Sequence, residues 1–209
     1  MGGDIYHFPK IDDRRKQDTL LVSFFLCLIL FSFDVSRTNG QTIFLHNGIN
    51  WSKIDYENAE FDRSYISGLS IDYFEKKFFF LSSGVSVAHK GGRLYLSTFP
   101  YDEEPNYYIK TNYISFYSQF NLAYRLGKIK MYAGCGPRFD IRTNHHNVRE
   151  VNNVLCGLHS TIGVNYAINN RFVLGVNTNY SPTFTHVFQN RTWKETSLAF
   201  EINIGYTFK

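Results

Sequence analysis

Cysteine, long apolar runs and charge of a single sign are all scarce in this chain. The three cysteines, Cys27, Cys135 and Cys156, include no pair at the close spacing of zinc ligands or of a redox motif. Only one segment is apolar enough to resemble a membrane helix, which excludes a polytopic helical membrane protein. The 22 lysines and arginines barely outnumber the 18 aspartates and glutamates and are scattered along the chain, so nucleic-acid binding is not expected.

Aromatic side chains are abundant instead. The 209 residues include 20 Phe, 15 Tyr and 2 Trp, together 18% of the chain, and this composition favours strands over helices. A hydrophobic fraction of 44% and a charged fraction of 19% exclude a disordered polypeptide. The length suits a single domain.

The one long apolar run lies near the N-terminus, over Thr19–Phe33. It follows the basic residues of Arg14–Lys16 and is shorter than the roughly 20 residues that a spanning helix needs. A basic segment followed by such a run is typical of a secretory signal peptide. We therefore expect residues 1–40 to be a signal helix that is cleaved after Gly40, and residues 41–209 to be the mature domain.

From Gln41 onward, apolar residues recur with a period of two rather than with a helical period. Between Ser197 and Phe208 the even-numbered residues are apolar, whereas the odd-numbered residues are small or polar. The same alternation predicts seven further strands, at Ile49–Trp51, Tyr65–Tyr73, Phe79–Val87, Ile114–Leu126, Ile129–Arg142, Gly157–Tyr166 and Phe172–Ser181. Eight is an even number of strands, as in bacterial outer-membrane barrels.

The connections between these strands alternate between short and long. Short turns are expected at Phe74–Lys77, Gly127-Lys128 and Asn169–Arg171. Long polar loops are expected at Asp55–Arg63, Lys90–Asn112, Thr143–Asn153 and Pro182–Glu195. This alternation is typical of an up-and-down barrel whose short turns face the periplasm and whose long loops face outward.

The residues of the polar stripe distinguish a membrane barrel from a soluble one. A soluble barrel buries its apolar face and exposes many charged residues, but here the polar stripes consist mainly of Gly, Ser, Asn, Thr and Ala. Such small groups suit a narrow interior. Aromatic residues at the strand ends suit the two interfaces of a membrane; they are Tyr73, Tyr124, Tyr166, Tyr180, Tyr206 and Phe208. The sequence therefore predicts an all-β, eight-stranded antiparallel up-and-down transmembrane β-barrel.

Several segments of the predicted barrel resemble the PorT-like family of outer-membrane β-barrels in Gram-negative bacteria. The resemblance runs from Gly48 to the C-terminus, and its most specific piece is Leu126–Asp140, supported by Gly48–Ser52, Gly84–Gly91 and Gly205–Phe208. It implies the barrel fold and an outer-membrane location. It implies no chemistry, because the family shares an architecture rather than an activity.

Two groups of residues are candidate sites. Arg138 and Glu201 both belong to the polar stripe, and counting from the long-loop ends places them at similar depth, so they form either an interior ion pair or two separately solvated charges. The loop Lys90–Asn112 combines acidic and aromatic residues. Its candidate binding surface consists of Tyr95, Phe99, Tyr101, Tyr107 and Tyr108.

Other combinations of reactive residues are not expected to act together. His159 and Ser160 are adjacent in a strand and face opposite sides, so they do not form a catalytic pair. His145 and His146 lie in a loop without an evident third metal ligand. Cys135 and Cys156 are expected to be free thiols, because their strand positions do not align.

An eight-stranded barrel has an interior that its own side chains fill, so a wide pore is not expected. We expect a non-enzymatic outer-membrane protein without cofactors, whose loops bind a partner or ligand. Its other partners would be outer-membrane lipid and, during biogenesis, the barrel-assembly machinery; the resemblance adds a secretion or envelope component. A lipid-modifying enzyme and a narrow channel are the alternatives.

Overall fold

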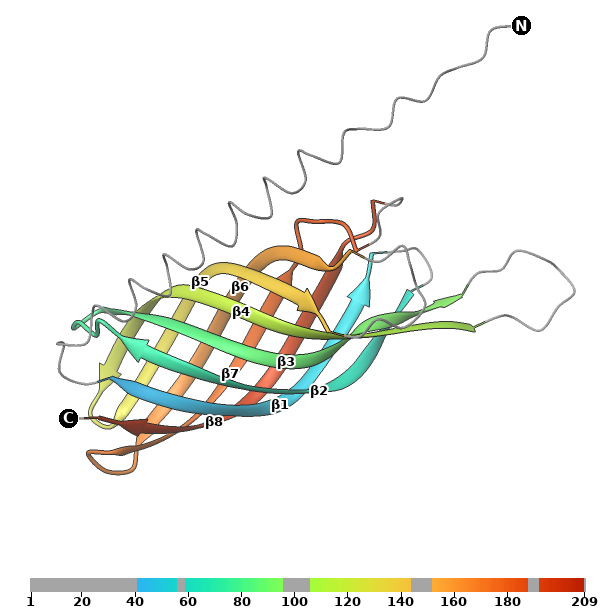
Figure 1. Ribbon diagram of the computed structural model, residues 1–209. Helices are drawn as coiled ribbons and strands as arrows, with labels where there is room; N and C mark the ends of the chain where they lie inside the picture. The colour runs from blue at the N-terminus through green and yellow to red at the C-terminus, as the bar shows by residue number, and fades with distance from the viewer. Residues whose placement is uncertain (1–40, 56–58, 96–105, 144–151, 188–191, 209) are drawn as a thin grey trace, which may run out of the picture. The chain divides into compact units, whose positions relative to one another are not determined.

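The computed structural model describes residues 41–55, 59–95, 106–143, 152–187 and 192–208, which form one closed β-barrel (Figure 1). The predicted leader, residues 1–40, lies outside the described residues. In the described part of the chain no helix is long and apolar enough to cross a membrane. The eight strands are β1 (Thr42–Ile54), β2 (Ala59–Tyr73), β3 (Phe79–Tyr95), β4 (Asn106–Leu126), β5 (Ile129–Arg142), β6 (Val154–Ala167), β7 (Phe172–Pro182) and β8 (Glu195–Thr207).

Each strand pairs antiparallel with its neighbours in sequence, and β8 closes the barrel by pairing with β1. Thr42 pairs with both Asp72 and Thr207, so the start of β1 and the end of β8 lie at the same end as the short β2–β3 turn. We call this the short-turn end and the opposite one the loop end. The β4–β5 turn has the two residues Gly127 and Lys128 between paired Leu126 and Ile129, and Gly127 adopts a φ of 60° that glycine tolerates.

The predicted alternation is confirmed in all eight strands. In β8, Phe200, Ile202 and Ile204 point outward and are 51%, 59% and 57% exposed, while Glu201 and Asn203 are buried inside. In β4, the buried inward residues include Tyr117, Gln119 and Asn121. The architecture predicted from the sequence, an antiparallel eight-stranded barrel with its polar stripes enclosed, is therefore the one observed.

Two of the predicted loops are longer than those in the structure, because part of each predicted loop belongs to a strand. β2 already begins at Ala59, and β3 and β4 continue to Tyr95 and from Asn106, with Lys90 paired to Thr111. Charged and polar residues dominate these strand ends, so no apolar period marks them in the sequence. A register shift between Phe61 and Ile66 also interrupts the alternation at the start of β2.

Large inward side chains are accommodated by glycines on the neighbouring strand. Tyr117 pairs with Gly84, and a Cβ atom added at Gly84 would collide with the Tyr117 ring. Tyr132 lies over Gly163 in the same way. These close approaches let two tyrosines enter a narrow lumen that otherwise holds small polar groups.

Candidate functional site

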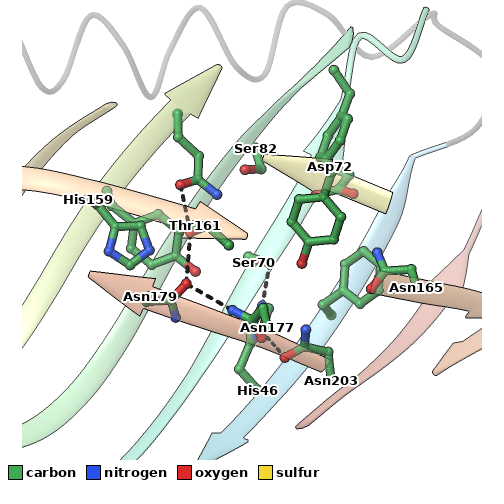
Figure 2. A pocket seen from close by; sticks show the side chains of 15 residues that line it. His46, Ser70, Asp72, Ser82, His159, Thr161, Asn165, Asn177, Asn179 and Asn203 are labelled. Atoms are coloured by element: carbon green, nitrogen blue, oxygen red, sulfur yellow. Dashed lines mark hydrogen bonds between the residues drawn. The ribbon is translucent and has the colours of Figure 1, made fainter. Parts of the chain in front are cut away.

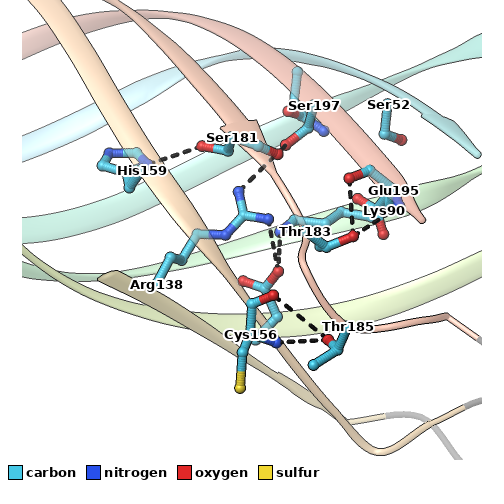
Figure 3. A network of polar contacts seen from close by, with 12 residues as sticks. Ser52, Lys90, Arg138, Cys156, His159, Ser181, Thr183, Thr185, Glu195 and Ser197 are labelled. Atoms are coloured by element: carbon cyan, nitrogen blue, oxygen red, sulfur yellow. Dashed lines mark hydrogen bonds and ion pairs between the residues drawn. The ribbon is translucent and has the colours of Figure 1, made fainter. Parts of the chain in front are cut away.

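Buried charges gather inside the barrel at its loop end (Figure 3). Lys90 Nζ lies 2.7 Å from Asp140 Oδ2, and Arg138 Nη2 lies 2.9 Å from the same oxygen. Glu195 is a second buried carboxylate, and it interacts electrostatically with Lys90. We call Lys90, Arg138, Asp140 and Glu195 the charge cluster. Each of its side chains is almost fully enclosed, so its charges depend on one another rather than on solvent.

An apolar group packs beside the charge cluster at this end. Ile54, Tyr113, Leu155 and Val187 are at most 3% exposed and form one core, with Trp193 packed against them. Lys90 Nζ lies 5.6 Å from the centroid of the Tyr113 ring, close enough for a cation–π contact. Hydrophobic packing thus excludes water from one side of the ion pairs.

Arg138 and Glu201, considered from the sequence either as an interior ion pair or as two separately solvated charges, have different partners in the structure. The carboxylate partner of Arg138 is Asp140, and Arg138 Nη1 also donates to Ser197 Oγ at 3.4 Å. Ser197 precedes Glu201 by four residues of β8, which places Glu201 about 13 Å farther along the strand. The strands are tilted and differ in length, so residues at the same count from the loop ends lie at different depths in the barrel. The sequence count therefore assigned Arg138 and Glu201 similar depths that they do not have.

Midway along the lumen, His46 joins three strands (Figure 2). Its Nδ1 lies 2.7 Å from Asn203 Oδ1, and its Nε2 lies 2.5 Å from Ser70 Oγ. The carbonyl oxygen of Asn203 only accepts, so Nδ1 carries the hydrogen and Nε2 accepts from the Ser70 hydroxyl. Glu201 lies near the same imidazole at 3.6 Å and accepts from the Asn177 amide at 3.3 Å.

In many hydrolases a serine nucleophile donates a hydrogen bond to a histidine base, and a third group orients that histidine by accepting a hydrogen bond from it. Ser70, His46 and Asn203 have this arrangement. The surroundings of Ser70 do not allow that chemistry. The cavity that it lines has about 20 Å³ of volume open to water, room for about one water molecule and not for a substrate. Ser70 also pairs with Phe44 and Gly84 within the sheet, so backbone N–H groups near it are engaged in the strand ladder rather than free to bind an oxyanion.

A second histidine, His159, belongs to the same interior. Its ring stacks on Tyr117 with centroids 4.4 Å apart, and its Nδ1 lies 2.9 Å from Ser181 Oγ. His159 is buried in the lumen while Ser160 pairs with Cys135 on the outward stripe, so the two neighbours face opposite sides, as expected. The serine that contacts His159 is therefore not its neighbour in sequence, Ser160, but Ser181, twenty-two residues later.

At the short-turn end, Lys130 fills the lumen. Its Nζ lies 3.1 Å from Asp72 Oδ2, 3.2 Å from Glu75 Oε1 and 4.1 Å from the centroid of the Phe80 ring. Glu75 also forms an ion pair with Arg125. Ion pairs between lysine or arginine and carboxylates therefore occupy both ends of the lumen, and the middle holds mainly neutral polar groups together with Glu201 beside His46.

The interior leaves little room for solutes. In the described part of the lumen, one cavity lies around His46 and His159 and another lies beside Arg138, and each has about 20 Å³ open to water. Among the described residues, no three histidines, cysteines or acidic residues gather where they could hold a metal ion. His145 and His146 lie outside the described residues.

The outer wall is apolar along the full height of the barrel. Besides the residues of β8, Leu122, Ile162 and Val176 are 61%, 70% and 55% exposed. Exposed aromatic residues lie near the strand ends; they include Tyr124, Tyr166, Tyr180 and Phe208, whereas Tyr73 is buried against Ser83. An outer surface of this kind is stable in hydrocarbon rather than in water.

Comparison with known proteins shows the fold. No protein-family model and no curated protein matches this chain. The crystal structure of the outer membrane protein OprG from Pseudomonas aeruginosa is similar, with a TM-score of 0.53 and 11% identity over 81% of this chain and 96% of OprG. Neisserial surface protein A, NspA, gives a TM-score of 0.52 and 12% identity over 79% of this chain and 97% of NspA.

The solid-state NMR structure of the outer membrane protein AlkL gives a TM-score of 0.50 and 12% identity over 82% of this chain and 92% of AlkL. This fold is that of an outer-membrane β-barrel.

The described part of the barrel contains both cysteines of the predicted mature domain. Cys135 and Cys156 are free thiols, as predicted, and Cys135 is exposed on the outer wall.

The predicted binding surface of the barrel lies largely on strands rather than in a loop. Tyr95 ends β3, and Tyr107 and Tyr108 lie in β4, where they pair with Leu94 and Arg93. Phe99 and Tyr101 lie outside the described residues. Among the described residues, β4 begins its pairing with β5 only at Tyr113, so residues 106–111 pair with β3 alone. We call the paired segments 91–95 and 106–111 the β3–β4 arm, which extends from the barrel in Figure 1.

Proposed function

We propose that the protein is a non-enzymatic integral protein of the outer membrane that binds a protein or ligand through its β3–β4 arm. The filled lumen is the observation that carries this proposal. Its interior cavities hold about one water molecule each, so neither solute passage nor catalysis inside the barrel has the space it needs. A functional surface must then lie outside the barrel wall.

The β3–β4 arm supports this proposal by its position and composition. It continues past the rim of the barrel, and Tyr95, Tyr107 and Tyr108 belong to its paired strands. Tyrosine is enriched in binding surfaces, because its rigid ring offers a large contact area at low entropic cost. We also propose, from the segments Gly48–Ser52 and Leu126–Asp140, that the chain is a divergent member of the PorT-like family, with an envelope or secretion component as its partner.

The arm can be tested by replacing residues 93–108 with a two-residue Asn-Gly turn. The matched control shortens the connection between Pro182 and Glu195. Crosslinking in intact envelopes should capture a partner with the native protein and with the control, and should lose it with the arm variant. A partner that persists without the arm would contradict the proposal.

A lipid-modifying activity has one observation in its favour, the contact between His46 and Ser70. We expect no hydrolysis of lipid A or phospholipids by the purified barrel and no labelling of Ser70 by a fluorophosphonate. Planar-bilayer recordings should show no sustained conductance, because each of the two described lumen cavities has room for about one water molecule. Lipid hydrolysis that is lost in Ser70→Ala, or stable ion flow, would replace the proposed function by an enzyme or a channel.

A further inference from the structure

In the described part of the chain, the short-turn end carries exposed basic residues that form no ion pair with a carboxylate. Each short turn exposes at least one cation: Lys76 and Lys77 between β2 and β3, Lys128 between β4 and β5, and Arg171 between β6 and β7. Among the described residues, the two carboxylates at this end, Asp72 and Glu75, pair with other cations. These four side chains therefore present uncompensated positive charge.

Two of the turns line an open cavity at the surface. Lys128, Asn169, Asn170 and Arg171 line an open cavity of about 480 Å³ together with Ala167 and Ile168. The backbone holds its two sides together, since the Ala167 amide donates to the Lys128 carbonyl at 2.8 Å. The volume lies within the range of small-ligand sites.

The polar groups of this cavity suit an anion. Asn169 Oδ1 accepts hydrogen bonds from the backbone N–H groups of Arg171 and Phe172, at 2.8 and 2.7 Å. The side-chain group of Asn169 that remains for a ligand is its N–H donor. The lining thus offers an ammonium, a guanidinium and amide donors, and it contains no carboxylate. Phosphate oxygens are the acceptors that such a set binds best.

The cavity continues onto the apolar outer wall. Ile168 and Phe172, at its edge, are 53% and 47% exposed. In the neighbouring turn, Lys76 and Lys77 lie over the exposed rings of Phe74 and Phe78, with each Nζ 5.1 Å from the ring centroid. Aromatic rings beside cations are typical of the headgroup level of a membrane.

We propose that the cavity between the β4–β5 and β6–β7 turns binds the phosphate headgroup of an anionic phospholipid, with the acyl chains against Ile168 and Phe172. A free phosphate ion would not use this apolar edge. The inference rests on the proposed membrane location, which puts the short turns at the lipid headgroups.

The test uses the protein inserted in nanodiscs of equal phosphatidylglycerol and phosphatidylcholine, with native mass spectrometry to identify the lipids that stay bound. The wild type should retain phosphatidylglycerol preferentially. Each cation near a membrane surface changes anionic-lipid binding about fivefold. Lys128→Gln with Arg171→Gln should therefore reduce the preference by at least about tenfold.

The matched control, Arg63→Gln with Lys194→Gln, removes one arginine and one lysine near the loop end and should keep the preference. The variant Lys128→Arg with Arg171→Lys should also keep it. Equal lipid ratios in the wild type and the cavity variant would overturn the inference, as would a preference that millimolar inorganic phosphate abolishes. Failure to insert, seen as loss of protease protection in vesicles, would instead refute the membrane location.

Discussion

Asp140→Asn should be among the most destabilising single substitutions in this barrel. Asp140 holds both Lys90 and Arg138 by ion pairs to one oxygen, and its side chain is 1% exposed. Neutralising it leaves two buried cations with Glu195 as the only remaining carboxylate of the charge cluster. Breaking a buried pair from one side costs about 3–5 kcal/mol, because the partner charge stays buried without compensation. We expect a loss of this size in the free energy of unfolding.

A pair of double-mutant cycles separates the two candidate partners of Arg138. With an effective dielectric constant near 20, two unit charges about 3 Å apart attract by roughly 5–6 kcal/mol, and desolvation offsets part of this. The cycle of Arg138→Ala with Asp140→Ala should therefore give a coupling of about 2–3 kcal/mol. The cycle with Glu201→Ala should give about 0.5 kcal/mol or less, since Glu201 lies about 13 Å farther along β8.

Reversible unfolding in guanidinium, followed by tryptophan fluorescence in lipid vesicles, measures these free energies. Asp55→Asn is the matched control, because Asp55 is an exposed carboxylate at the same end of the barrel and should lose less than about 0.5 kcal/mol. The charge cluster would not be a stabilising element if Asp140→Asn lost no more than this control. A coupling of Arg138 to Glu201 as large as that to Asp140 would refute the assignment of partners.

Three further predictions follow from the lumen and the wall. Gly84→Ala should lower the free energy of unfolding by about 1–3 kcal/mol, because its Cβ meets the Tyr117 ring and, less closely, the Leu69 carbonyl oxygen. In a Tyr117→Ala background the same change should cost less, and equal costs would contradict the close packing. Cys135 in vesicles should react with a membrane-permeant maleimide and resist a charged one, and labelling by both would place it in water. Non-reducing electrophoresis should show no bond between Cys135 and Cys156, and a reduction-sensitive shift would overturn the register of β5 and β6.

The fold could be predicted because the side-chain period of a strand is a local property. The alternation from Leu198 to Phe208 requires no knowledge of neighbouring strands, and it correctly placed Phe200 outside and Glu201 inside. Turn chemistry is also local, as at Gly127 and Lys128. Long strand ends in which apolar residues do not alternate with polar ones, such as the end of β3 that contains Lys90, carry no such signal and were predicted as loops.

The interior partners depend on the relative depth of tilted strands, which a single sequence does not contain. Arg138 and Asp140 are two residues apart in β5 and therefore face the same side, so their proximity was readable from the alternation. Lys90 comes from β3, fifty residues earlier, and its contact with Asp140 depends on the register of three strands. The partnership of His46 with Ser70 and Asn203 depends on β8 closing against β1 in the same way.

The charge cluster has a consequence for ion passage through the lumen. When all four of its groups are ionised, its two cations and two carboxylates sum to zero formal charge, so the cluster favours neither cations nor anions by its net charge. Evolution of a pore from this scaffold would therefore first have to unbalance those four side chains.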